Sequence, residues 1–585
     1  MAKNIVYALG IDAKPEKDGF YRGRTHILLW MPEGFLNFTL LDDYGKSRLK
    51  KEDLPVIPEQ FTLSVRRRKT QKGMMTDKSA LRQMEAIREI FDSSDNIVIA
   101  TGAGRKGETS FRRLYSYLDC NKPLSRLWLY TITADSIRKG FKNLRNISLY
   151  DNLFLAADCR EKADSLVNTN ISAAFGLATG ILPCHMGRLE IPVLSMICKR
   201  YFEHRKTIST RFFEHYLTVK KNEIFRQFRT ENCIKNRKKA EKIYNCLKTA
   251  DTTKIVKNQV FNKIQPAPLL YNLTALQKDA FLRYGFSTQK TMEAAEKLYE
   301  EKLISCPRTD GRFIPESLLD SIPKLLRQTA HYCNLKDCLN IFDWENLNRN
   351  SVKATAVSLH HAIIPTGIYP VYMPTDQKII YEMIVTRTLE AFAPDCEKQC
   401  SRLEAVAGNR KFYSLKSSVL SPFNWRSIMN REEDREKDET LEESHFTAFS
   451  ENETLPVSSR CLVSHKTLSP PLYTEATLLE EMENASLGTA ESRSVIIENL
   501  LNRNHIRRQG QFLLPDEMGL LIYSYTKDMC ISDVETASQW EETLMKISSG
   551  EQDAETVLDG FKTFTRKAVD EILSINPSIK NKHIL

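Results

Sequence analysis

The order of apolar runs and glycine-rich turns predicts an α/β segment in the first part of the chain. An apolar run over 96–100 is followed by a glycine-rich turn and then by apolar side chains at helical spacing over 111–118. A second strand candidate spans 126–132, and a helix is expected to begin near Thr133. Elements that alternate in this way imply an α/β domain.

The remaining chain divides into helical and strand-rich segments. Helical periodicity covers about 151–206 and returns over 491–585, whereas alternating apolar and polar residues over about 207–267 indicate strands around a charged helix. Residues 236–242, NRKKAEK, are the densest basic stretch, and a solvated helix face is the simplest explanation for them. We therefore expect a multidomain chain with α/β and α+β parts.

Two short helices and a strand are predicted over 270–306. Residues 274–277, TALQ, match a helix-capping box, and Gly285 can end that helix in a left-handed conformation before the second helix begins. The following LISC, residues 303–306, is predicted to be a strand. Two helices followed by a strand resemble a winged helix-turn-helix.

Composition and charge narrow the class of protein. The 585 residues are too many for one core, and the formal net charge of +10 suggests a polyanionic partner such as nucleic acid. The 13 cysteines are scattered without CxxC pairs, which favours reduced thiols over a zinc ribbon or a disulfide framework. Neither a membrane-spanning run nor a signal peptide is found, so we expect a cytoplasmic protein. Residues 430–445 are acidic and almost without apolar side chains, which indicates a mobile surface loop or hairpin tip.

Five sequence segments together resemble one enzyme family. They are LYNLTALQKDAFLRYGFSTQKT (270–291), CPRTDGR (306–312), HHAIIPTG (360–367), SPPLYTEATLLEEME (469–483) and ASQWEETLMKISSGE (537–551). Their order is that of the bacterial topoisomerase III-like type IA DNA topoisomerases. The resemblance implies a Toprim α/β domain and three further domains around a hole large enough for duplex DNA.

The resemblance also implies domain boundaries and a monomer. The expected divisions are a Toprim-like domain over 1–150, a helical DNA-binding domain over 151–206 and 480–585, a β-rich arch over 207–267 and 406–479, and a winged-helix-like domain with the nucleophile position over 268–405. The family opens with a strand and a glutamate of the active site, whereas this chain begins about where the next helix would run. Either the true start lies upstream or the first domain is reshaped.

The nucleophile of such enzymes is a tyrosine that forms a covalent link to a DNA phosphate. Residues 301–314, EKLISCPRTDGRFI, resemble the loop that carries it, but Cys306 stands in its place. The resemblance assigns contacts with the scissile phosphate to Arg308 and His360. It also places three arginines at nucleic-acid-binding positions: Arg105, Arg188 and Arg493.

The magnesium-binding motif of the family is altered as well. Residues 99–108, IATGAGRKGE, resemble ATDxDREGE, but Gly102, Gly104 and Lys106 occupy the three acidic positions. Magnesium prefers an oxygen shell that includes one or two carboxylates, and only Glu108 remains at the end of the motif. We therefore expect no metal and no other cofactor.

Three hypotheses follow. The first is a degenerate type IA topoisomerase that binds single-stranded DNA while strand cleavage and religation are lost or impaired. The second is an active topoisomerase that uses Cys306 or another residue, although Tyr299 is expected to be a core residue. The third is a decaying reading frame, which the coherent helix caps and arginine positions argue against.

Overall fold

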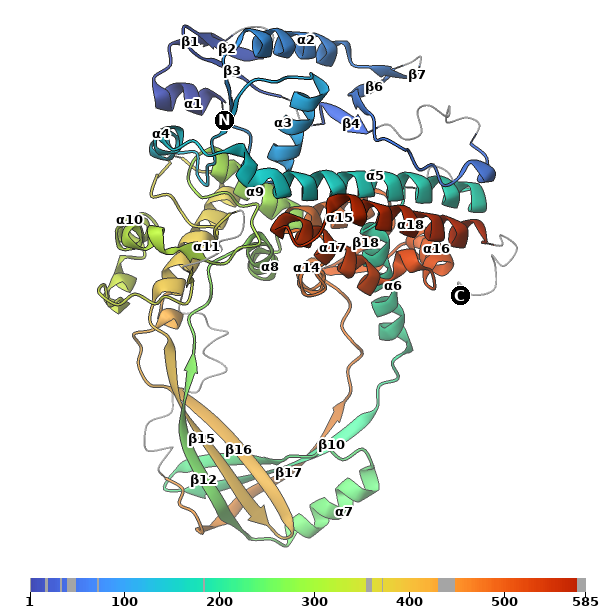
Figure 1. Ribbon diagram of the computed structural model, residues 1–585. Helices are drawn as coiled ribbons and strands as arrows, with labels where there is room; N and C mark the ends of the chain where they lie inside the picture. Colours follow the sequence, from blue (N-terminus) through green and yellow to red (C-terminus); the bar gives the residue numbers. More distant parts are fainter. Residues whose placement is uncertain are drawn as a thin grey trace.

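The protein has the form of a ring (Figure 1). The computed structural model describes residues 2–15, 19–31, 34–38, 49–70, 73–181, 185–353, 360–370, 372–429 and 448–575. A β-barrel at one end is connected on two sides to a broad helical layer, and a smaller α/β layer covers that layer on its far side (Figure 1). The expected multidomain α/β and α+β fold is therefore present. The acidic stretch over 430–445 lies outside the described residues.

In its described residues the N-terminal unit combines small sheets with four α-helices. Its elements are α1 (Ala2–Leu9), β1 (Ala13–Pro15), β2 (Phe20–Gly23), β3 (Ile27–Leu29), β4 (Leu36–Phe38), β5 (Leu63–Val65), β6 (Arg67–Thr70), β7 (Gly73–Thr76), α2 (Lys78–Ser93), β8 (Ile97–Ile99), α3 (Arg105–Tyr117), β9 (Leu124–Arg126) and α4 (Ala134–Lys142). β8 and β9 pair in parallel, and within the described residues neither has another neighbouring strand.

The strand, glycine-rich turn and helix predicted for this unit are confirmed as β8, residues 100–104 and α3. The helix predicted near Thr133 is α4, whose first turn is capped because the Thr133 hydroxyl accepts a hydrogen bond from the Ser136 amide. The prediction of a strand over 126–132 is wrong beyond Arg126. β8 ends at Ile99 and offers no partner farther along, so the apolar side chains that follow Arg126 are buried without strand pairing.

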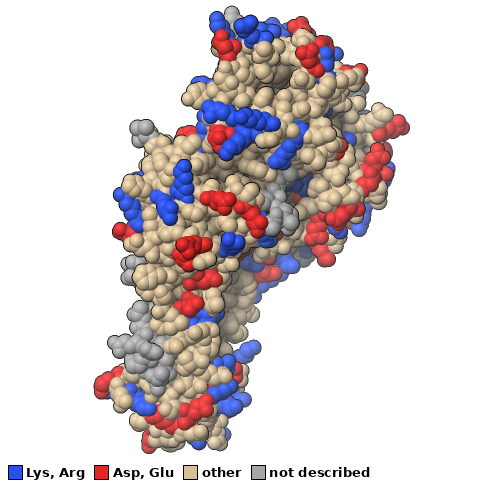
Figure 2. All heavy atoms as spheres, turned by 60° about the vertical axis from the view of Figure 1, so that its left-hand side comes forward, with Lys and Arg blue, Asp and Glu red and all other residues tan. Residues whose placement is uncertain are grey.

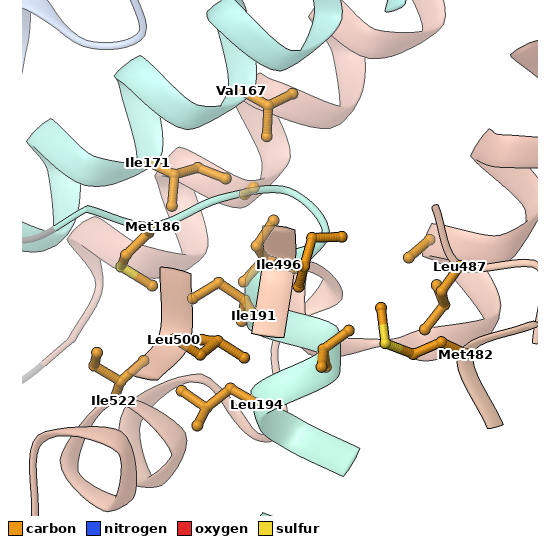
Figure 3. Close-up of a cluster of buried hydrophobic side chains, with 14 of the residues drawn as sticks. Val167, Ile171, Met186, Ile191, Leu194, Met482, Leu487, Ile496, Leu500 and Ile522 are labelled. Atoms are coloured by element: carbon orange, nitrogen blue, oxygen red, sulfur yellow. The ribbon is translucent and has the colours of Figure 1, made fainter. Parts of the chain in front are cut away.

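The helical unit is built from two distant parts of the chain. Its elements are α5 (Asp151–Thr179), α6 (Glu190–Lys206), α14 (Glu475–Asn484), α15 (Ala490–Asn502), β18 (Ile506–Gln509), β19 (Phe512–Pro515), α16 (Glu517–Thr526), α17 (Val534–Ser549) and α18 (Ala554–Leu573). Val167 and Ile171 of α5 face Ile191 of α6 and Ile496 of α15 in one core (Figure 3). Burial of this apolar surface holds the two parts of the chain together.

The barrel is closed by six strands in the order β10-β11-β16-β15-β12-β17. These strands and the helix packed beside them are β10 (Arg211–Lys221), β11 (Ile224–Thr230), α7 (Arg237–Lys248), β12 (Thr252–Gln265), β15 (Cys396–Ala407), β16 (Arg410–Val419) and β17 (Thr454–Lys466). The expected boundary between 405 and 406 is wrong, because β15 pairs with β12 from Cys396 to Val406. The barrel part therefore begins at Cys396.

The third unit packs between the barrel and the N-terminal unit (Figure 1). Its elements are α8 (Leu273–Tyr284), α9 (Thr288–Glu300), β13 (Ile314–Pro315), α10 (Ile322–Tyr332), β14 (Val352–Lys353) and α11 (Thr375–Phe392). Gly285 ends α8 with φ 65° as predicted, but the predicted capping box is wrong, because Asn272 rather than Thr274 caps the helix. Residues 303–306 are not a strand; only Ile304 forms an isolated bridge, with Pro365.

Short 3-10 helices lie between the longer helices and strands. They are η2 (Lys51–Asp53), η3 (Ile147–Tyr150), η4 (Glu316–Ser321), η5 (Lys336–Ile341), η6 (Trp425–Ser427) and η7 (Cys530–Ser532). Among the described residues no helix is both long and apolar enough to cross a lipid bilayer. On the face shown in Figure 2, Lys and Arg side chains alternate with Asp and Glu side chains. Positive charge on that face is therefore interrupted by acidic groups.

Candidate nucleic-acid and strand-cleavage site

A cavity of about 1140 Å³ lies where the N-terminal, third and helical units meet. The glycine-rich turn over 102–107, the loop over 306–310 and the start of α15 over 488–491 all line it. The sequence places these segments hundreds of residues apart, so only the ring brings them together. Five of the six predicted site residues line this cavity: Arg105, Cys306, Arg308, His360 and Arg493.

Cys306 is held in the cavity wall as a neutral thiol. Its backbone amide donates to the Tyr130 carbonyl at 3.1 Å, and the residue is only 8% exposed. Burial raises the pKa of the thiol to about 11, although the neighbouring Arg308 acts in the opposite direction. The nucleophilic species is the thiolate, which is scarce at neutral pH for such a pKa. Tyr299 also lines the cavity, and burial raises the pKa of its phenol.

Arg308 is engaged by carboxylates on both sides. Its guanidinium donates to Glu296 of α9 at 2.8 Å and to Glu491 of α15 at 2.8 Å. Burial acts to lower the pKa of Arg308, but Glu491 and Glu296 outweigh it and hold the pKa above its ordinary value. A DNA phosphate that binds Arg308 has to compete with these two carboxylates.

His360 lies against the glycine-rich turn. The backbone of Ala103 forms a hydrogen bond with its ring, and the Tyr130 ring packs edge-on at 6.2 Å. Burial lowers the pKa of His360 to about 4, so the imidazole is neutral at physiological pH. His360 can therefore hydrogen-bond a phosphate, but it adds no positive charge to the cavity at that pH.

Arg105 is the cavity arginine with no carboxylate engaged. Its guanidinium forms no hydrogen bond or ion pair with any residue that the structure describes, while Asp310, Glu541 and Glu491 act on it only at longer range. Burial lowers the pKa of its guanidinium, which still remains protonated in proteins. Its donors are available to a phosphate oxygen without breaking an ion pair.

Arg188 is the predicted site residue that does not line the cavity. It is 2% exposed, and it donates to Asp164 at 2.8 Å and to Glu541 at 2.9 Å. Arg160 donates to the same Glu541 carboxylate at 2.6 Å. Burial opposes ionisation of Glu541, but Arg160 and Arg188 lower its pKa to about 2. Arg188 therefore ties α5 to α17 and acts on the cavity only through Glu541, which lines it.

Arg493 lines the cavity, but its guanidinium is used in hydrogen bonds within the protein. It is 5% exposed and donates to Asp310 at 3.1 Å, to Thr274 at 3.1 Å and to the Gly488 carbonyl at 3.2 Å. These contacts fix the start of α15 against α8 and the loop after Cys306. Direct binding of a phosphate by Arg493 would require these hydrogen bonds to be broken.

The glycine-rich turn folds tightly onto α3. A Cβ atom on Gly107 would lie 2.0 Å from the Gly102 carbonyl oxygen, so no other residue fits there. The Thr101 hydroxyl donates to the Gly107 carbonyl at 2.9 Å and closes the turn. The turn is therefore shaped by its backbone, although Gly102 and Gly104 provide no side-chain oxygen.

The donor set does not fit the magnesium ion that the family resemblance implies. Glu108 is fully buried, and its two oxygens accept from Arg126 at 2.6 Å and from Arg112 at 3.2 Å. The Arg126 guanidinium also donates to the carbonyls of Thr101 at 3.0 Å and Gly102 at 2.9 Å. Within the described part of the chain, no group of three or more His, Cys, Asp or Glu side chains could hold a metal ion. Arginine thus occupies the position beside Glu108 where a cation would be needed.

Acidic residues are abundant around the cavity, which the sequence analysis did not predict. The described basic residues of its lining are Arg105, Lys106, Arg160, Arg308 and Arg493. The described acidic residues are more numerous: Asp151, Glu296, Glu300, Asp310, Glu483, Glu491 and Glu541. Taken alone, the loss of three acidic side chains at Gly102, Gly104 and Lys106 would make the pocket more attractive to phosphate. Instead, carboxylates from α9, α14, α15 and α17 compensate most of the cations. No local motif marks these acidic residues, because they come from helices distant in sequence.

Comparisons with known proteins identify the family of the chain. A family model described as DNA topoisomerase matches residues 148–559. DNA topoisomerase 3 of Staphylococcus aureus strain USA300 is 28% identical over 608 aligned residues, which cover 100% of this chain and 82% of the relative. The chain belongs to the bacterial type IA, topoisomerase III-like DNA topoisomerase family.

A second relative and a solved structure also resemble the chain. DNA topoisomerase 3 of Bacillus cereus is 28% identical over 620 aligned residues, again with 100% of this chain and 82% of the relative covered. The solved structure of full-length topoisomerase I from Thermotoga maritima superposes with a TM-score of 0.67 at 20% identity, covering 85% of this chain and 82% of that one. At that identity the likeness supports the fold alone. The topoisomerase family thus accounts for nearly the whole chain.

Proposed function

We propose that this type IA topoisomerase family member binds single-stranded DNA but cleaves and religates it poorly or not at all. The main support for this proposal is the residue at the nucleophile position. Cys306 is a buried thiol whose pKa is raised to about 11, while arginines remain around it. A phosphate-binding cavity without an effective nucleophile favours binding over strand transfer.

The acidic positions support the same proposal. Efficient strand transfer needs stabilisation of the charge that develops at the phosphorus, and Gly102, Gly104 and Lys106 supply no carboxylate for a metal ion there. Glu108 is committed to Arg126 and Arg112. The proposed protein therefore works without a metal or another cofactor.

Single-stranded DNA is the proposed ligand because the cavity offers Arg105 without a competing ion pair among the described residues. Binding by cationic side chains releases counterions, so the affinity should fall as salt rises. In this proposal residues 1–150 act as the Toprim-like domain, and the winged-helix-like domain ends before Cys396. We further propose a monomeric, cytoplasmic protein, which sedimentation and cell fractionation would test.

The decisive experiment combines binding and cleavage. Anisotropy titration of a labelled oligothymidylate at several salt concentrations should give an affinity that declines with salt, while denaturing gels show no protein-linked oligonucleotide with or without Mg²⁺. An affinity independent of salt would reject binding through phosphates. A covalent protein–DNA product would reject the loss of cleavage.

The alternative function is an active topoisomerase, which is favoured by relatives named DNA topoisomerase 3 that match along the whole chain. Relaxation of negatively supercoiled plasmid, with and without Mg²⁺, separates the two proposals. Activity that disappears in Cys306→Ala would establish the thiol as the nucleophile. Activity that persists in Cys306→Ala would indicate another nucleophile or a contaminating enzyme.

A further inference from the structure

One carboxylate joins all three units that line the cavity. The same Glu491 oxygen accepts from Lys106 at 2.7 Å and from Arg308 at 2.8 Å. Lys106 belongs to α3 of the N-terminal unit, Arg308 to the loop that carries Cys306, and Glu491 to the first turn of α15. Glu296 also pairs with Arg308, but it lies in the same unit as its partner. Among the described partners of Arg308, Glu491 is thus the one that connects separate units.

Glu491 places a negative charge among the residues that are predicted to bind phosphate. Its charge acts on Arg105, Arg308, Cys306 and His360 together. Carboxylates and phosphates are both oxyanions, and Arg and Lys bind both through charge-assisted hydrogen bonds. A phosphate that enters the cavity therefore needs the donors that Glu491 now uses.

The ion pairs of Glu491 are weak enough to be exchanged. The side chains are 57% exposed for Lys106, 41% for Arg308 and 26% for Glu491, so water screens both pairs. Pairs with this exposure contribute little to stability, and a competing anion can replace them. A permanent structural bridge is instead expected to be buried, as Arg188 and Glu541 are with 2% and 3% exposure.

We propose that Glu491 is an internal competitor of the DNA backbone, which keeps the cavity closed until a phosphate takes over Lys106 and Arg308. This inference rests on the proposed binding of single-stranded DNA and adds how that binding is controlled. Removing the carboxylate takes away the Glu491 competitor from Lys106 and Arg308, while Arg308 keeps its pair with Glu296, and it breaks the connection between α3, the Cys306 loop and α15. The chain then binds single strands more tightly and opens more readily.

The test compares Glu491→Gln and Glu491→Ala with two matched controls. Glu535→Gln removes a carboxylate from the second residue of α17, the same helix position that Glu491 has in α15, and so controls for the interaction with the helix dipole. Glu498→Gln removes another paired carboxylate of α15, whose partner is Arg508 outside the cavity lining. Binding of a labelled oligothymidylate and hydrogen exchange without DNA are measured for the full chain and all four variants.

We expect both Glu491 variants to bind roughly threefold to tenfold more tightly than the unaltered chain, and the controls to stay within about twofold. Amide exchange over 101–108 and 306–312 should be faster in the Glu491 variants only. If DNA binds but the Glu491 variants gain no affinity, the inference is wrong and the proposed function stands. If no protein binds DNA, the proposed function fails, and the exchange comparison alone decides whether Glu491 closes the cavity. Unchanged exchange in both Glu491 variants overturns the inference in every case.

Discussion

The ionisation of Cys306 gives the sharpest quantitative test of the proposed loss of cleavage. With a pKa of about 11, roughly one thiol in three thousand is ionised at pH 7.5, compared with about one in ten for an ordinary cysteine of pKa near 8.5. The thiolate population is thus on the order of 300-fold smaller. A more basic thiolate is also a better nucleophile. The logarithm of its rate constant rises by about 0.45 for each unit of pKa, so each Cys306 thiolate should react roughly ten times faster than an ordinary one.

The net expectation is thiol–disulfide exchange at Cys306 that is roughly twentyfold to thirtyfold slower at pH 7.5, before burial slows access further. The experiment varies the pH. Because burial favours the neutral thiol, the rate of disulfide exchange at Cys306 should keep rising up to about pH 11. The assay is reaction with a disulfide reagent, followed by mass spectrometry of the Cys306 peptide. Cys246 and Cys461 are exposed and serve as controls in the same sample.

The reasoning is refuted if Cys306 reacts as fast as Cys246 and Cys461 and its rate levels off near pH 8.5. An ordinary thiol pKa at Cys306 would mean that the neighbouring cations fully offset the effect of burial. Cys306 would then be a credible nucleophile, and the active-topoisomerase alternative would gain support.

Three further outcomes are expected. Cys306→Tyr alone should not restore plasmid relaxation, because the carboxylates of the metal motif are still missing; robust Mg²⁺-dependent relaxation would show that these losses matter little. Arg188→Met should lower the free energy of unfolding by about 2–3 kcal/mol in urea titrations, since Glu541 keeps Arg160 but loses one of its two buried arginine partners, whereas Arg237→Met at an exposed pair should have almost no effect. Arg105→Ala should weaken single-strand binding and reduce its salt slope by about 0.7 with unchanged thermal stability; an unchanged slope would remove Arg105 from the phosphate contacts.

Local sequence signals predicted the elements around the cavity well where short-range physics decides them. The apolar run before the glycine-rich turn became β8, the amphipathic segment after it became α3, and Gly285 ended α8 because a left-handed backbone favours glycine. The strand expected at 303–306 did not form, since strand pairing requires a partner that no local pattern supplies. The same dependence on a partner moved the barrel boundary to Cys396.

The family, the altered residues at the nucleophile and metal positions and most helices could be predicted from the sequence, because these depend on residue identity and on contacts within a few positions. Which charges meet could not be predicted without the three-dimensional packing. Glu491 pairs with Lys106 and Arg308, and Glu108 pairs with Arg126, and in each case the partners lie on different elements. Cys306 is buried because segments distant in sequence pack around it. Electrostatic energies and pKa values depend on distance and solvent exposure, and both are fixed by the packing of distant segments.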